Sequence, residues 1–405
     1  MRVLVLSNVW VEPASSAAGR RMLQILSLFR EQEWEVMYAS TAKESGYGYN
    51  LDVLGITTQS VAINDEGFNA FAKAYAPNIV LFDRFMVEEQ FGWRISQECP
   101  DALRLLDTED LHCLRKARQQ AVKEGRPFVD RDLLTDVSKR EIASIYRCDL
   151  TFMISQFEMH LLQDFFKVSK SLLMYLPFLE EVLKGPFLPF KEREHFVSIG
   201  NFLHAPNWDA TLELKTKIWP LIKKKLPEAQ LHVYGAYPSE KVLQLHNKKE
   251  GFLVKGRALN AKEVIAASRV LLAPLRFGAG LKGKFIDAMQ CGTPSVTTTI
   301  GVEAMRGDLP WCGEVTDYYN DFAEVSIQLY SDEVVWEEAQ QNGMQIINEH
   351  FQKSEFDNYL LNHLITTLKN IEMHRLANFT GQILQHHTLQ STKYLSKWIE
   401  EKNKE

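Results

Sequence analysis

The sequence predicts an α/β protein made of two doubly wound domains that face a common cleft. One observation is that short apolar segments alternate with segments of helical periodicity, which is typical of parallel sheets covered on both faces. The second is that this alternation lapses at residues 177–194, where Pro177, Pro186 and Pro189 lie, and then begins again. A chain of 405 residues is also longer than one compact core accommodates.

The first predicted domain spans residues 1–180. Its expected strands are the apolar segments at residues 2–7, 35–40, 78–83, 103–107 and 150–155. A helix is expected over residues 19–32, because apolar side chains recur on one helical face at Met22, Leu23, Leu26 and Phe29. Residues 110–147 read as a charged helical stretch that is interrupted near residues 125–127.

The second predicted domain spans residues 195–350, and residues 351–405 are expected to form C-terminal helices. Strands are expected at residues 195–200, 231–235, 252–255, 270–274 and 293–298. The charged end of the chain, residues 397–405, is expected to fray. Ligands of such Rossmann-like sheets bind outside the carboxyl ends of the strands, so we expect the functional site in the cleft between the domains.

Composition narrows the class of protein. A formal net charge of −6 argues against general nucleic-acid binding. The five cysteines are scattered and form no Cys-x-x-Cys pair, which indicates a reducing compartment and no zinc site. No segment reaches the roughly 18 apolar residues of a membrane span, and the N-terminus does not resemble a secretion signal. We expect a cytoplasmic protein whose contact with membranes, if any, is peripheral.

The most informative segment is residues 277–301, FGAGLKGKFIDAMQCGTPSVTTTIG, which reads as a glycine-rich loop, a short helix and a buried strand. Its glycines are Gly278, Gly280 and Gly283, and its lysines are Lys282 and Lys284. Glycines allow close approach of a ligand, and a helix N-terminus with neighbouring ammonium groups favours an anion. The loop therefore suggests a diphosphate cradle, although an ordinary strand-to-helix turn with solvated lysines fits the spacing equally well.

The second domain resembles the donor half of glycosyltransferase family 4, the retaining group 1 glycosyl transferases of GT-B architecture. The matching segments are HFVSIGNFLHAPNWDA, IWPLIKKKLPEAQLHVYGAYP, FLVKGRA and VLLAPLRFGAGLKGKFIDAMQCGTPSVTTTIGVEAM. In the first domain, LDTEDLHCLR at residues 106–115 is similar to a DTVDLHxLR segment of a subgroup. The resemblance implies a GT-B fold, with the first domain on the acceptor side and the second binding a nucleotide sugar.

The resemblance assigns the donor-binding residues. The loop residues that would hold the diphosphate are Gly278, Ala279, Gly280, Leu281, Lys282 and Lys284. Asp287 would accept a hydrogen bond from the ribose, while Gly235 and Arg257 would lie near the base. The first glutamate of the family's Glu-x7-Glu pattern falls at Ala279 and is missing. A solvated helix carboxylate is the alternative for Asp287, and a turn glycine is the alternative for Gly235.

Candidate catalytic residues follow a strand of the first domain. Retaining transfer needs stabilisation of oxocarbenium-like charge and a base for the acceptor hydroxyl. The resemblance makes Asp110 the closest match to a residue that contacts the transferred sugar, with His112 and Asp107 as further candidates. A helix N-cap also explains either aspartate, and a structural role explains His112.

These observations favour an enzyme that moves a sugar from a UDP- or GDP-sugar to an acceptor hydroxyl with retention. No metal and no further cofactor are expected, because lysines and a helix dipole would neutralise the leaving diphosphate. The missing glutamate at Ala279 motivates a second hypothesis, a non-catalytic GT-B module that binds a nucleotide or a partner. A two-domain sugar-nucleotide epimerase is a third. The acceptor, which could be a glycan, a lipid-linked glycan, a protein or a small molecule, stays open.

Overall fold

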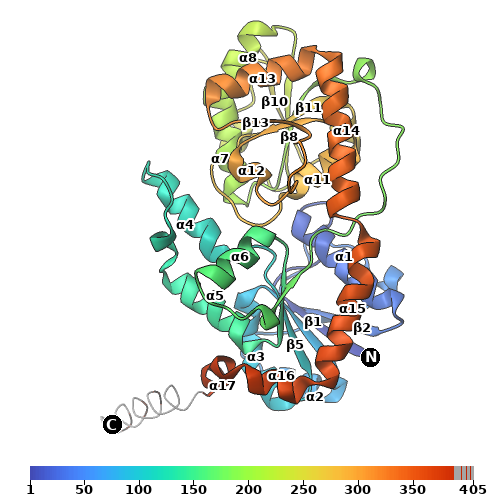
Figure 1. Cartoon of the computed structure of the whole chain (residues 1–405), viewed down its shortest axis with the longest axis vertical. Helices are drawn as coiled ribbons and strands as arrows, with labels where there is room; N and C mark the ends of the chain where they lie inside the picture. Colours follow the sequence, from blue (N-terminus) through green and yellow to red (C-terminus); the bar gives the residue numbers. More distant parts are fainter. Residues whose placement is uncertain (387–393, 395–397, 399–401, 403–405) are drawn as a thin grey trace.

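A computed structural model of the chain describes residues 1–386 together with 394, 398 and 402, and it contains two α/β domains, one above the other in Figure 1. The N-terminal domain holds a seven-stranded parallel sheet in the order β3-β2-β1-β4-β5-β6-β7. The C-terminal domain holds a six-stranded parallel sheet in the order β10-β9-β8-β11-β12-β13. The predicted α/β class with two doubly wound sheets is confirmed.

In the first domain the strands alternate with helices that cover both faces of the sheet. The strands are β1 (Arg2–Ser7), β2 (Glu35–Ser40), β3 (Thr57–Ser60), β4 (Ile79–Asp83), β5 (Leu103–Asp107), β6 (Leu150–Met153) and β7 (Leu173–Tyr175). The helices are α1 (Ala17–Glu31), α2 (Gly67–Tyr75), α3 (Phe85–Glu98), α4 (His112–Lys123), α5 (Asp136–Arg147) and α6 (Gln156–Asp164). The α4 and α5 helices project from the body of the domain (Figure 1).

The second domain repeats this arrangement on a smaller sheet. Its strands are β8 (Glu194–Ile199), β9 (Leu231–Tyr234), β10 (Phe252–Gly256), β11 (Ser268–Ala273), β12 (Ser295–Thr297) and β13 (Gly313–Val315). Its helices are α7 (Ala205–Glu213), α8 (Trp219–Lys225), α9 (Glu240–Leu243), α10 (Ala261–Ala266), α11 (Gly283–Gln290), α12 (Thr299–Val302), α13 (Tyr319–Ser331) and α14 (Glu333–His350).

The sequence analysis missed three short strands, each of which lies at the edge of a sheet. The β3 strand has the sequence TTQS and all four of its residues are exposed, so it lacks the apolar run that reveals a buried strand. The β7 and β13 strands are three residues each, and they complete sheet edges beside β6 and β12. Tertiary pairing rather than local sequence pattern determines these strands.

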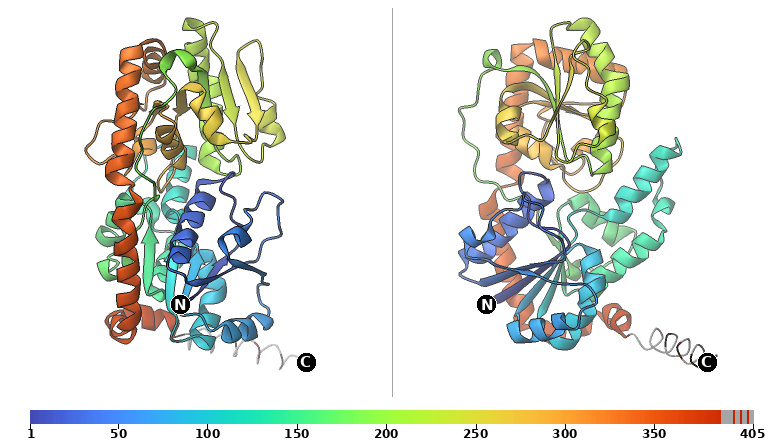
Figure 2. Two further views of the ribbon diagram at one scale, coloured as in Figure 1. Left: turned by 90° about the vertical axis from the view of Figure 1, so that its right-hand side faces the viewer. Right: turned by 180° about the vertical axis from the view of Figure 1, so that it is seen from behind.

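The chain crosses between the domains twice, and the two crossings lie side by side. The backbone N–H of Glu180 donates to Phe351 (2.7 Å), and that of Lys353 donates to Glu180 (2.8 Å). After the second crossing, α15 (Lys353–Lys369), α16 (Ile371–Ala377) and α17 (Phe379–Gln385) return to the first domain (Figures 1 and 2). Leu360, Leu361 and Leu364 of α15 join that domain's hydrophobic core.

Helices α15 to α17 lie within the segment expected to form C-terminal helices. Most of residues 387–405 lie outside the described residues, and so does the expected fraying of residues 397–405. Within the described part of the chain, no helix has the length and apolar character needed to cross a membrane. The five cysteines, all of which are described, are buried thiols without disulfide partners.

Candidate active site

A cleft of about 920 Å³ separates the two domains and is lined by residues of both. It lies where the strands of each sheet end, as expected for doubly wound sheets. Ten of the predicted site residues line it: Asp110, His112, Gly235, Arg257, Gly278, Ala279, Leu281, Lys282, Lys284 and Asp287. Asp107 and Gly280 are not among its lining residues.

The glycines of the loop allow the domains to meet. Gly280 has φ +64°, and a Cβ there would lie 2.9 Å from Cβ of Asp110 in the first domain. A Cβ on Gly283 would lie 2.4 Å from Cβ of Ala17. The N–H of Gly280 is also occupied, since it donates to Glu158 (2.7 Å). In this arrangement Gly280 and Gly283 serve interdomain packing, and the N–H of Gly280 is not available to a diphosphate.

The two loop lysines face the cleft. Lys282 is buried and donates to the carbonyl oxygen of Gly280 (2.8 Å), while the partly buried Lys284 donates to Oδ1 of Asn207 (2.8 Å). Burial lowers the pKa of each ammonium group to about 8. Both groups thus carry most of their charge at neutral pH, and an anion in the cleft would stabilise that charge further.

Asp287, the predicted ribose ligand, forms an ion pair with Arg20 of α1 across the cleft. Burial raises the pKa of the Asp287 carboxyl, although Arg20 opposes the shift. Arg20 also lies over the ring of Phe178, 4.9 Å from its centroid. The sequence analysis did not identify Arg20, because nothing in its local sequence distinguishes it from the other basic residues of α1.

Asp110 and His112 occupy the first-domain wall of the cleft. Asp110 accepts two hydrogen bonds from Arg115, at 2.7 and 3.2 Å, and lies 3.4 Å from Nε2 of His112. Burial would raise the pKa of Asp110, but Arg115 and His112 outweigh it and lower this pKa to about 2. Burial lowers the pKa of His112 to about 4. Asp110 is therefore a permanent anion near neutral pH, and His112 is a neutral imidazole.

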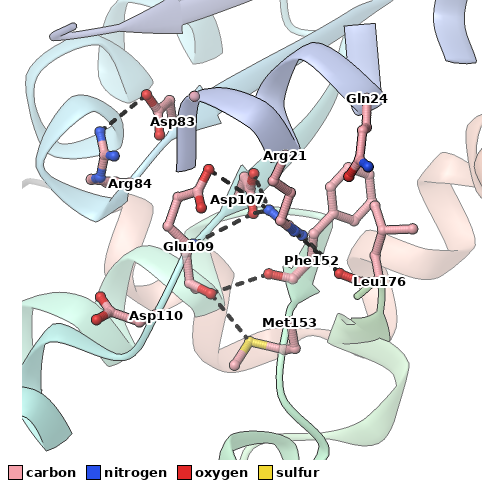
Figure 3. A network of polar contacts seen from close by, with 12 residues as sticks. Arg21, Gln24, Asp83, Arg84, Asp107, Glu109, Asp110, Phe152, Met153 and Leu176 are labelled. Atoms are coloured by element: carbon pink, nitrogen blue, oxygen red, sulfur yellow. Dashed lines mark hydrogen bonds and ion pairs between the residues drawn. The ribbon is translucent and has the colours of Figure 1, made fainter. Parts of the chain in front are cut away.

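Asp107 belongs to a buried network behind this wall (Figure 3). Its side chain is fully buried and accepts hydrogen bonds from Arg21, which also donates to the carbonyl oxygen of Leu176 (2.9 Å). Asp107, predicted as a candidate catalytic residue, therefore forms an ion pair with Arg21 in this structure and does not line the cleft. Its position at the end of β5 explains why sequence grouped it with Asp110.

Glu109 was not among the selected catalytic residues, yet it lines the cleft. Its backbone has φ +60°, and that of Arg84, which also lines the cleft, has φ +74°, so two residues of this wall have a backbone conformation that non-glycine residues rarely adopt. Burial and the nearby Asp107 raise the pKa of the Glu109 carboxyl well above its usual range. The positive φ is a property of the folded backbone, and the sequence does not indicate it.

Two further first-domain residues hold the loop of the second domain. Arg118 of α4 donates to the carbonyl oxygen of Gly278 (2.9 Å) and to both carboxylate oxygens of Glu303 (2.8 and 2.7 Å). Glu158 of α6 accepts from the N–H groups of Leu111 (3.1 Å) and Gly280. Burial, followed by the charge of Asp110, raises the pKa of Glu158 to about 8. These contacts link the Asp110 segment directly to the loop.

Comparison with known proteins finds a matching family model for the second domain. Residues 193–332 match the model of a family described as Glycosyl transferases group 1. The predicted resemblance to group 1 glycosyltransferases is confirmed. No curated protein sequence matches the chain significantly.

Solved structures show that the fold is GT-B. Sucrose-phosphate synthase (tll1590) from Thermosynechococcus elongatus aligns over 92% of this chain and 100% of its own, with a TM-score of 0.66 and 16% identity. Anabaena Alr3699/HepE in complex with UDP covers 90% of this chain and 100% of its own, with a TM-score of 0.66 and 11% identity. WaaG, a glycosyltransferase involved in lipopolysaccharide biosynthesis, aligns over 89% of this chain and 98% of its own, with a TM-score of 0.60 and 13% identity.

Proposed function

We propose that this protein is a glycosyltransferase that moves a sugar from a nucleoside diphosphate to an acceptor hydroxyl with retention of configuration. The observation that carries the proposal is the distribution of charge across the cleft. Lys282 and Lys284 line it on the second-domain side, and Asp110 lines it on the first-domain side. A leaving diphosphate and a developing sugar cation need these opposite environments.

The lysines are suited to the diphosphate. When the bond between the anomeric carbon and the phosphate oxygen breaks, negative charge grows on that oxygen. Lys282 and Lys284 stand at the start of α11, an eight-residue helix whose positive end adds to their field. Cations already in place when the charge develops stabilise it without reorganisation.

Asp110 is suited to electrostatic stabilisation rather than proton transfer. A carboxylate with a pKa of about 2 binds protons too weakly to serve as an efficient base at neutral pH. Its negative charge instead favours an oxocarbenium-like sugar nearby. Burial raises the pKa of the neighbouring Glu109 carboxyl well above its usual range, so Glu109 is the group on this wall that binds a proton more tightly than Asp110 and can exchange one with the acceptor or the leaving group.

The structural relatives guide the choice of donor. Anabaena Alr3699/HepE was crystallised with UDP and with UDP-glucose. We therefore propose a UDP-sugar as the first donor to test and keep a GDP-sugar as the alternative. The acceptor class, whether glycan, lipid-linked glycan, protein or small molecule, is left to the assay.

A non-catalytic nucleotide-binding module is the second candidate. Two observations favour it: Ala279 stands where the family has a glutamate, and the Asp287 carboxylate is occupied by Arg20. Both reduce the polar contacts that the second domain offers to a donor.

Two measurements separate the candidates. Thermal unfolding with UDP, GDP and ADP should show stabilisation by UDP or GDP. Incubation with UDP- and GDP-sugars, followed by product analysis, should then release nucleoside diphosphate through transfer or hydrolysis. Binding without release would support the module, an epimerised donor would support the epimerase, and no stabilisation by any nucleotide would contradict all three.

A further inference from the structure

Arg257 has an unusual position in the cleft. It follows β10 and lines the cleft, and its Nη1 atom is buried without a hydrogen-bond partner among the described residues. A buried guanidinium nitrogen that lacks a partner is costly, and such groups commonly find theirs in a ligand. The end of the cleft at Arg257 also contains Gly235 and Tyr237, which follow β9.

A first-domain side chain holds this guanidinium. The guanidinium carbon of Arg257 lies 3.9 Å from the centroid of the Tyr47 ring, which is a close cation–π contact. Tyr47 is 51% exposed and is not among the residues that line the cleft. Its ring therefore supports Arg257 from outside and leaves the cleft itself open.

The loop that carries Tyr47 is fastened to the first domain on both sides of that residue. Trp10 donates to the carbonyl oxygen of Ala42 (2.9 Å), and the N–H of Tyr49 donates to the carbonyl oxygen of Val11 (2.8 Å). Ser45 donates to Glu12. These bonds determine where Tyr47 stands relative to the second domain.

Glu12 also fixes the neighbouring side chain of the second domain. It accepts a hydrogen bond from the hydroxyl of Tyr237 (2.8 Å), and the Tyr237 ring packs edge-on against Tyr47, with centroids 6.1 Å apart. Tyr237 has φ +56°, a strained conformation for a bulky residue and one that is common at ligand clamps. Tyr47 and Tyr237, one from each domain, thus contact each other beside Arg257.

We propose that Tyr47 positions Arg257 for recognition of the nucleotide base, so that Nη1 donates a hydrogen bond to a ring carbonyl oxygen of uracil or guanine. The inference rests on the proposed function and extends it, because it adds a first-domain side chain to the recognition of the nucleotide base. Adenine has no ring carbonyl oxygen, so the contact favours UDP or GDP over ADP.

The test measures binding of UDP, GDP and ADP by calorimetry to the full-length protein and its variants. For the nucleotide that wild type binds best, Tyr47→Ala should raise the Kd about five-fold and Arg257→Ala should raise it about ten-fold or more. Both substitutions should also reduce the ratio of the Kd for ADP to the Kd for that nucleotide. Tyr47→Phe keeps the ring and should bind within about two-fold of wild type. Tyr49→Ala is the matched control and should bind like wild type, since Tyr49 lies in the same loop but the cation–π contact of Arg257 is with the ring of Tyr47.

A double variant tests whether Tyr47 acts through Arg257. If it does, adding Tyr47→Ala to Arg257→Ala should cause little further loss. Unchanged binding by Tyr47→Ala, equal losses in Tyr47→Phe and Tyr47→Ala, or additive losses in the double variant would each overturn the inference while leaving the proposed function intact. Failure of wild type to bind any of the three nucleotides would overturn both.

Discussion

At the scale of single residues, the surroundings of a carboxylate decide its use. Asp107 ends β5 and Asp110 follows three positions later, but Asp107 is enclosed with Arg21 and Asp110 faces the cleft beside Arg115 and His112. The first is placed to hold the wall together, and the second is placed to act on a ligand.

Replacement of Asp110 by asparagine should reduce transfer by roughly 100-fold or more, because it removes a charge used chiefly in the transition state. Nucleotide-sugar affinity should stay within a few-fold. Initial rates and calorimetric binding provide the measurement. Unaffected transfer would show that Asp110 only orients Arg115.

Asp107→Asn provides the contrast. Breaking a buried ion pair by removing one charge typically costs about 3–5 kcal/mol, so this variant should show a lower free energy of unfolding. Its loss of activity should follow its loss of folded protein. A normally stable Asp107→Asn protein without activity would contradict the structural role assigned here.

At the scale of elements, the loop before α11 concentrates the cations of the site. Burial brings the pKa of Lys282 and Lys284 to about 8, so both lose their charge as the pH rises through that value. Diphosphate affinity depends on the charged form. The affinity for a diphosphate should therefore be highest well below pH 8 and should decline above it.

The Lys282→Ala/Lys284→Ala double variant should bind UDP or GDP at least ten-fold more weakly, since each charge-assisted contact is worth about 1.5–3 kcal/mol. Its affinity should also change much less between pH 7 and 9. Glu158 titrates in the same range, so Glu158→Gln is the matched control and should keep the decline. Equal pH profiles in wild type and the double variant would exclude the lysines as its cause.

The lysines of the same loop lead us to predict that transfer does not need a divalent metal. Protein cations already neutralise the leaving group in the proposed site, and no Asp-x-Asp motif stands at a strand end beside the loop. Among the described residues, no group of three or more histidine, cysteine or acidic side chains is arranged to hold an ion. Rates in excess chelator should stay within about two-fold of those with magnesium. Complete loss that magnesium or manganese restores would contradict this prediction.

At the scale of the whole molecule, contacts between domains assemble the site. Arg118 binds Glu303 and Gly278, and Glu158 binds Gly280, so the loop is held from the opposite domain. The site is therefore complete only with the two domains in contact. Interdomain residues should affect turnover without weakening either domain on its own.

Glu303→Gln tests this coupling. Loss of one partner from the mostly buried Arg118 pair should favour a more open molecule and lower transfer about ten-fold, because this pair joins the two domains. Small-angle scattering with bound nucleotide should show a larger radius of gyration than wild type. Asp209→Asn, which breaks the ion pair between Asp209 and Arg276 inside the second domain, is the control. Identical scattering and activity for Glu303→Gln and wild type would show that the ion pair between Arg118 and Glu303 does not hold the domains together.

The sequence by itself determined the features that depend on neighbouring residues. Alternation of apolar and polar segments predicted both sheets, and the glycines and lysines at 278–284 predicted which loop would face the cleft. The polar β3 strand has no apolar pattern and was missed. Gly280 and Gly283 were predicted to let a ligand approach the loop, whereas in the structure Asp110 and Ala17 of the first domain approach them.

Only the tertiary structure decided which distant residues meet. Arg20 and Asp287 are 267 positions apart, and Arg118 and Glu303 are 185 apart. Periodicity and spacing record contacts within a turn or a strand, whereas these pairs depend on how two separately folded sheets pack. The positive φ of Glu109, the burial that lowers the pKa of the two lysines and the contact of Tyr47 with Arg257 likewise depend on the folded structure, because neighbouring residues in the sequence do not set them.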